Sequence, residues 1–188
     1  MYTLFLDTHD STIRIVLYKE EQPIIKKEIE TEKNQSSRVM PVLIQVLEEA
    51  KIEIKNIKEI IVVNGPGSFT GVRIGVTIAK TLAFTLNIPI KVMSSLLVKA
   101  VSISHEKINI IEREKNGVFL GTFDKNNQLL EEYKYLSNKE YEAWAYKEEA
   151  IEDIALDYEK IYYFAKKIKS TNPHAVNPLY VKKIEVQK

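Results

Sequence analysis

Gly65, Pro66, Gly67, Ser68 and Thr70 are the residues whose types and spacing best suit ligand binding. The two glycines allow backbone angles that other residues resist, and the proline fixes one φ angle. Ser68 or Thr70 can cap the free amides at the start of a following helix. Because such amides attract negative charge, the chemistry expected of this turn is the binding of an anion.

Two apolar segments must position this turn. The β-branched run 60–63 is typical of a strand buried in a parallel sheet. Residues 70–86 are apolar nearly all round, which predicts a buried helix. The turn therefore connects the end of a strand to the start of a helix.

The spacing of the turn does not match three familiar motifs. A Walker phosphate loop needs Gly-Lys-Ser/Thr, but no lysine follows the glycines until Lys80. A dinucleotide fingerprint needs a third glycine three residues after the second, and Gly71 comes one residue late. A serine-hydrolase elbow needs a glycine two residues before the serine, where this chain has Pro66.

The predicted helix carries a stripe of small residues. Gly71, Gly75, Ala79 and Ala83 recur every four positions, so they share one face that another backbone can approach closely. Arg73 is a polar exception on this apolar helix. Spacing alone leaves two interpretations open: the stripe packs against the sheet of its own chain, or it contacts a partner.

Composition excludes several classes of protein. The chain has 188 residues, 45% hydrophobic and 28% charged, which is ordinary for a globular protein with one core or two small lobes. A formal net charge of +1 provides no general attraction to nucleic acid. The absence of cysteine excludes disulfides and thiolate metal sites, and His9, His105 and His174 lack metal-binding spacing. With no long uncharged apolar run, we expect a cytoplasmic protein without a membrane segment.

The first half of the chain predicts three strands followed by alternating helices and strands. The expected order is strands 2–7, 12–18 and 23–30, helix 36–51, strand 60–63, helix 70–86 and strand 88–93. In the second half we expect strands 108–111, 118–123 and 128–133. A later helix is expected to align Ile154, Tyr158, Ile161, Tyr162, Ala165 and Ile168 on one face. This pattern predicts mixed sheets with helices on their faces.

Several segments together carry a family resemblance. The sequence Gly65-Pro-Gly-Ser-Phe-Thr-Gly-Val-Arg-Ile-Gly75, with Leu6-Asp7-Thr8 and residues 36–41, resembles the bacterial TsaB family, also called YeaZ. Ser94-Ser95-Leu96 and the ending Pro178-Leu-Tyr-Val-Lys182 agree with it. The likeness covers most of the first hundred residues and the last fifteen, and between them it is thin.

The resemblance implies a fold and a function. The fold would be two-lobed, of the actin-like ATPase and sugar-kinase kind, with lobes at 1–94 and 95–188 and the second lobe reduced. TsaB-like proteins are non-catalytic subunits of the machinery that forms threonylcarbamoyladenosine next to the anticodon of tRNA. The implied partners are a TsaD-like catalytic subunit, a TsaE-like ATPase or a second copy, with tRNA reached only through the complex. The chain would bind no cofactor or metal, and ATP and metal would belong to the partners.

In this family the two first-lobe helices form the dimer surface, which favours the partner interpretation of the small-residue stripe. Helices 36–51 and 70–86 are then expected to form the interface, through Val39, Leu43, Val46, Gly71, Arg73, Gly75 and Ala79. The turn characteristic of the family would be Gly65, Pro66, Gly67, Ser68, Phe69 and Thr70. Whether that turn contacts a nucleotide stays open.

Enzymes of the same fold provide an alternative function. Its phosphotransferases hold ATP at a turn Asp-x-Gly-x-Thr, whereas this chain has Asp7-Thr8-His9-Asp10-Ser11, with histidine in place of glycine. That disfavours ATP chemistry and favours Asp7 as a structural carboxylate accepting turn amides. Peptidase activity would need a metal-binding histidine pair, which is missing. Direct tRNA binding through Lys166, Lys167, Lys169, Lys182 and Lys183 is a third hypothesis, and we expect it to be weak.

Overall fold

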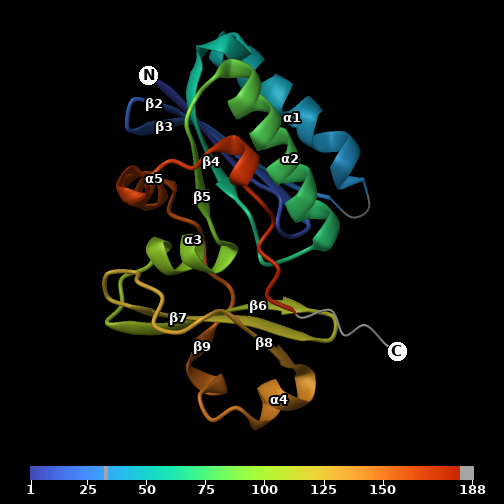
Figure 1. The fold of residues 1–188 in the computed structure, drawn as a ribbon, viewed down its shortest axis with the longest axis vertical. Helices are drawn as coiled ribbons and strands as arrows, with labels where there is room; N and C mark the ends of the chain where they lie inside the picture. Colours follow the sequence, from blue (N-terminus) through green and yellow to red (C-terminus); the bar gives the residue numbers. More distant parts are fainter. Residues whose placement is uncertain (32–33, 183–188) are drawn as a thin grey trace.

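The computed structural model describes residues 1–31 and 34–182, which form two sheets with helices on their faces (Figure 1). The larger sheet has the order β3-β2-β1-β4-β5, and the smaller has the order β8-β7-β6-β9. The larger contains β1 (Tyr2–Asp7), β2 (Thr12–Lys19), β3 (Gln22–Glu30), β4 (Ile57–Val63) and β5 (Ile90–Met93). The smaller contains β6 (Lys107–Glu114), β7 (Gly117–Asp124), β8 (Lys134–Ser137) and β9 (Ala150–Ile151). The α-helices are α1 (Gln35–Ala50), α2 (Phe69–Leu86), α3 (Ser95–Ser102), α4 (Asn138–Ala143) and α5 (Tyr158–Lys167).

The central strand β1 is buried on both faces of the larger sheet. Leu4 and Leu6 belong to an apolar cluster with α1 and α2, whereas Phe5 belongs to a cluster with α3 and α5. Figure 1 shows these helix pairs on opposite sides of the sheet. Since β1 and β4 are parallel, the turns that follow them leave the sheet at the same edge. The Asp7 turn and the glycine-rich turn are brought together in this way.

Helix α3 connects the cores of the two lobes. Its residues Val98 and Val101 pack with the larger sheet and α5, whereas Leu96 and Ala100 pack with Ile108 and other residues of the smaller sheet. Figure 1 shows α3 between the two sheets, with α4 beyond the far side of the smaller one. The lobes therefore share an apolar connection along one side.

The small-residue stripe of α2 packs against its own chain. A methyl group added at Gly71 would overlap the carbonyl oxygen of Thr8, and one at Gly75 would overlap the Thr8 hydroxyl. The Thr8 Oγ1 hydroxyl donates a 2.7 Å hydrogen bond to the carbonyl oxygen of Gly71. Ala79 and Ala83 are also buried. Although α2 has the length and hydropathy of a membrane-crossing helix, this packing accounts for its small-residue face.

The element predictions hold for the first half of the chain and fail in places in the second. The strand predicted at 128–133 is wrong, because the Asp124 carboxylate accepts the amides of Asn126 and Gln128 in a turn and the strand begins only at Lys134. Helix α3 was not predicted. Ile154 and Ile168 flank α5, because Asp157 caps its start and Ile168 has extended backbone angles.

Candidate functional site

A cleft of about 2260 Å³ lies between the two lobes. Its first-lobe wall contains Asp10 and Ser68, and its second-lobe wall contains Glu112 and Tyr135. Tyr180, from the end of the described chain, lines it as well. The two turns that follow the parallel strands β1 and β4 both reach this cleft, which makes it the candidate site.

The glycine-rich turn is tightly docked against the turn after β1. Gly65 and Gly67 have φ angles of 98° and 156°, in the region that favours glycine. A Cβ atom at Gly67 would overlap the carbonyl oxygen of His9, and the Ser68 amide donates a 2.6 Å hydrogen bond to that oxygen. Ser68 also caps α2, since its Oγ accepts a hydrogen bond from the Gly71 amide, as the sequence predicts for Ser68 or Thr70.

Three carbonyl groups at this turn accept hydrogen bonds from neighbouring segments. Ser95, at the start of α3, donates its amide to the Gly65 carbonyl and its hydroxyl to the Pro66 carbonyl, at 2.8 Å and 2.6 Å. The Leu179 amide donates to the carbonyl of Asn64 at 2.8 Å. The turn thus joins β4, α2, α3 and the C-terminal segment, and its binding of an anion stays a prediction.

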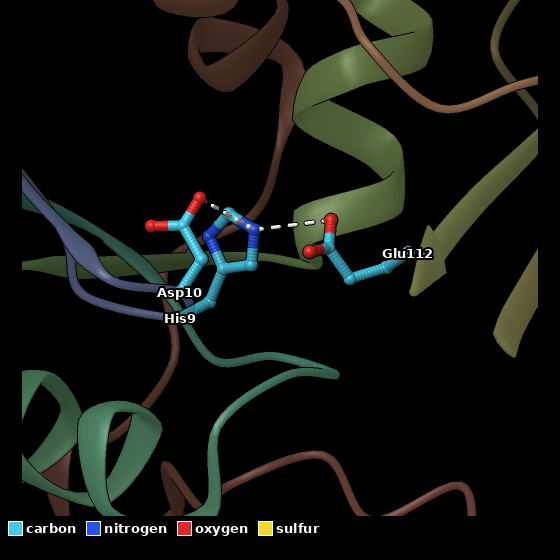
Figure 2. Close-up of side chains that lie close together, drawn as sticks. All are labelled: His9, Asp10 and Glu112. Atoms are coloured by element: carbon cyan, nitrogen blue, oxygen red, sulfur yellow. Dashed lines mark hydrogen bonds and ion pairs between the residues drawn. The ribbon is translucent and has the colours of Figure 1, made fainter. Parts of the chain in front are cut away.

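His9 lies at the floor of the cleft with only 1% of its surface exposed. Its Nδ1 lies 2.7 Å from an oxygen of Asp7, which also accepts the His9 amide at 3.0 Å. Its Nε2 lies 3.3 Å from Glu112 Oε2, on strand β6 of the other lobe, and 3.7 Å from an oxygen of Asp10 (Figure 2). Asp7 thus accepts a turn amide, as the sequence predicts, and its purely structural role stays a prediction.

Two further cations complete the cluster around His9. Arg14 donates two hydrogen bonds to Asp10, at 2.8 Å and 2.7 Å, and lies 3.6 Å from Asp7. Lys99, on α3, lies 2.5 Å from Glu112. A protonated His9 with Arg14 and Lys99 therefore balances the charges of three carboxylates, those of Asp7, Asp10 and Glu112.

The charged surroundings decide the protonation of His9. Burial alone would lower the pKa of His9, but the attraction and hydrogen bonding of Asp7 and Glu112 raise this pKa to about 10. Burial would raise the pKa of the Glu112 carboxyl, and the contacts with His9 and Lys99 outweigh it and lower that pKa. Both groups are therefore charged at neutral pH.

The cluster suits an internal ion-pair network better than a phosphate or a metal ion. The His9 side chain occupies the position where a phosphate-binding turn of this fold needs glycine, and its amide and ring are both bonded to Asp7. His9, Asp10 and Glu112 offer donor atoms within 4.8 Å of one another, as a metal site would require. Arg14 and Lys99 already neutralise the two acidic members of that group.

Comparison with known proteins identifies the family. A protein-family model described as "TsaD: tRNA N6-adenosine threonylcarbamoyltransferase" matches residues 27–169. The tRNA threonylcarbamoyladenosine biosynthesis protein TsaB of Bacillus subtilis is 38% identical over 135 residues, which are 70% of this chain and 59% of that protein. The chain belongs to the TsaB/YeaZ family. TsaB of Buchnera aphidicola subsp. Schizaphis graminum is 31% identical over 68% of this chain and 62% of its own length. This chain thus spans about three fifths of the length of these relatives.

Solved structures confirm the fold. A Pseudomonas aeruginosa protein described as similar to the peptidase YeaZ superposes with a TM-score of 0.78 at 19% identity, covering 96% of this chain and 99% of that one. YeaZ from Pseudomonas aeruginosa superposes with a TM-score of 0.75 at 20% identity, covering 95% and 99%. The two-lobed α/β fold expected from the resemblance is confirmed. The division at residues 94 and 95 stays a prediction.

The residues predicted at the partner interface need correction. Six of them are buried within the chain, so their side chains are covered by its own sheet and turns: Val39, Leu43, Val46, Gly71, Gly75 and Ala79. The small-residue stripe of α2 thus packs against its own chain, which is the first of the two interpretations. Arg73 is exposed. The use of these two helices by a partner stays a prediction, and their outer faces would have to carry it.

Arg73 instead contacts two aromatic residues that line the cleft, Phe69 and Tyr180. Its guanidinium lies 3.6 Å from the ring centre of Phe69, and its Nε donates a 2.7 Å hydrogen bond to the hydroxyl of Tyr180. Lys182 continues this segment to the second lobe, with its ammonium 2.8 Å from Glu114. The C-terminal segment therefore lies across both lobes, which the sequence did not predict.

The basic residues considered for tRNA binding are partly neutralised. Lys182 pairs with Glu114 and Lys166 pairs with Glu21, whereas Lys167 and Lys169 are exposed. Lys183 lies outside the described residues. This arrangement favours the expectation of weak direct binding to tRNA.

Proposed function

We propose that this chain is a non-catalytic, cytoplasmic subunit in the formation of threonylcarbamoyladenosine in tRNA, and that it pairs with a TsaD-like catalytic subunit. Two of its relatives are tRNA threonylcarbamoyladenosine biosynthesis proteins. In the proposed assembly a TsaE-like ATPase joins the pair, ATP and metal belong to the partners, and tRNA is contacted through the complex. The chain also pairs with a second copy of itself when the partner is missing.

The His9 cluster is the observation that carries the non-catalytic assignment. A phosphotransferase of this fold needs open space and a free carboxylate at the turn after its first strand. Here the His9 side chain fills that space and one oxygen of the Asp7 carboxylate is bonded to it, with both residues buried. An incoming phosphate would also meet the negative charge of Asp10 and Glu112.

The outer faces of α1 and α2 support the proposed pairing. Met40 and Ile44 on α1 are 39% and 49% exposed, although both are large apolar side chains. On α2, the side chains of Ile74, Ile78 and Leu82 are half-buried against the core. The two helices lie side by side in Figure 1 and contact each other. Their apolar outer residues suit burial against a partner.

Sedimentation of the full chain mixed with the TsaD-like protein of the same genome tests the pairing. We expect a stable one-to-one complex that forms without nucleotide, because the proposed surface is apolar and already ordered. If the two proteins sediment separately at micromolar concentrations, the proposed subunit role is wrong. The chain alone serves as the control and reports self-association.

A further inference from the structure

We propose that protonated His9 is a latch that ties the two lobes together at the floor of the cleft, and that losing its proton lets the cleft open. His9 belongs to the turn after β1 in the first lobe, and Glu112 belongs to β6 in the second. Figure 2 shows the imidazole between Asp10 and Glu112, with Glu112 approaching from the opposite side. The latch is a property of this chain alone and does not depend on the identity of its partner.

The contact between His9 and Glu112 lies where it can limit the movement of one lobe relative to the other. Helix α3 joins the two apolar cores on one side and the C-terminal segment contacts both lobes, so the lobes would move about these two connections. His9 and Glu112 line the cleft, where the 3.3 Å contact between them spans the two lobes. The ammonium of Lys99, on α3, lies 2.5 Å from the Oε2 atom of Glu112. Asp7 therefore fixes His9 at one end of the latch and Lys99 fixes Glu112 at the other.

The chemistry of imidazole explains why the proton matters. A protonated ring donates from both nitrogens, so Nδ1 can bond to Asp7 while Nε2 bonds to Glu112. A neutral ring has one N–H group. If Nδ1 keeps that proton for Asp7, the lone pair of Nε2 faces a carboxylate oxygen of Glu112, and the attraction between the lobes becomes repulsion.

Within the described part of the chain, the carboxylates that face His9 raise its pKa, and nearby positive charges oppose this effect. Asp7, Asp10 and Glu112 favour the charged ring, whereas the nearby Arg14 and Lys99 are held by those carboxylates. Asp7 and Glu112 outweigh the effect of burial and raise the pKa of His9 from 6.5 to about 10. The latch is thus closed at neutral pH. Its contribution to stability is complete below pH 6.5 and is lost as the pH rises toward 10.

Spin labels placed across the cleft would test the latch directly. The chain contains no cysteine, so Ser36→Cys on α1 and Lys139→Cys on α4 would be its only thiols. Both residues are exposed and line the cleft from opposite lobes. Pulsed electron paramagnetic resonance on the full chain then reports the distance between the lobes.

We expect one narrow distance distribution at pH 7 for the doubly labelled chain. The variants His9→Gln and Glu112→Ala should each shift it to longer distances, and the combined variant should shift it no further, since both remove the same contact. His105→Gln is the matched control. His105 contacts carbonyl oxygens of its own lobe, at Asp124 and Ile103, so the distribution should stay unchanged.

A pH series separates the latch from a purely structural role. The interlobe distance should increase at the same pH midpoint at which NMR shows His9 losing its proton. Glu112→Gln removes a negative charge beside His9, so it should lower that pH midpoint. An unchanged distribution in folded His9→Gln, checked by circular dichroism, would overturn the proposal. If that variant does not fold, titration of His9 in the otherwise natural chain without any change in interlobe distance overturns it equally.

Discussion

Replacing Gly71 with alanine is expected to lower the free energy of unfolding by about 3 kcal/mol. The added methyl group would overlap the Thr8 carbonyl oxygen and approach the Gln35 side chain. The Thr8 oxygen belongs to the backbone directly after β1, so it cannot move aside cheaply. The gain in helix propensity, about 1 kcal/mol, only partly offsets this overlap. Urea denaturation followed by circular dichroism measures the change.

Thr77→Ala is the matched control for this prediction, because Thr77 is exposed on the same helix. It should change the free energy of unfolding by less than about 0.5 kcal/mol. Equal stability of Gly71→Ala and the natural chain would contradict the close packing of α2 on the Thr8 turn. The same packing means that Gly75→Leu would disturb the core through Thr8, so it is unsuitable as an interface variant.

Replacing Ile44 with aspartate is expected to weaken pairing with the TsaD-like partner about 100-fold, or about 3 kcal/mol. Ile44 is 49% exposed on the outer face of α1, so the free chain tolerates a charge there. In the proposed complex the aspartate would be buried without a cation, which costs several kcal/mol. Titration calorimetry with the partner measures the dissociation constant.

Ile24→Asp provides a matched control on another surface. Ile24 is 43% exposed on β3, at the edge of the larger sheet and away from the outer faces of α1 and α2. It should leave the dissociation constant unchanged. Met40→Asp, one helical turn before Ile44, should weaken the pairing as Ile44→Asp does. Unchanged affinity in both α1 variants would place the partner surface elsewhere.

The first lobe could be predicted because its patterns are local and regular. The β-branched strands and the apolar spacing of Val39, Leu43 and Val46 identify β1, β4 and α1 from neighbouring residues alone. Helix α3 was missed because it has only eight residues, fewer than the about 11 over which helical periodicity is recognised. The prediction of a strand at 128–133 was wrong because the Asp124 carboxylate stabilises a turn there, so that β8 begins only at Lys134.

The candidate site was predictable only in part. Motif spacing identified the Gly65 turn and the unusual His9, but Glu112 lies 103 residues from His9 and carries no local signal of the contact. The prediction that six buried residues lie at the partner interface was wrong for another reason. Small residues at helical spacing allow close approach equally to an internal turn or to a partner, and only the fold showed that Thr8 occupies the space beside Gly71 and Gly75.

The proposed role is tested most directly by measuring threonylcarbamoyladenosine in tRNA. Purified tRNA, the TsaD-like and TsaE-like proteins of the same genome, ATP and the activated threonylcarbamoyl donor would be combined with and without this full chain. The account predicts that the modified nucleoside forms only when the chain is present, and that Ile44→Asp greatly reduces it while Ile24→Asp does not. Equal modification without the chain would contradict the account.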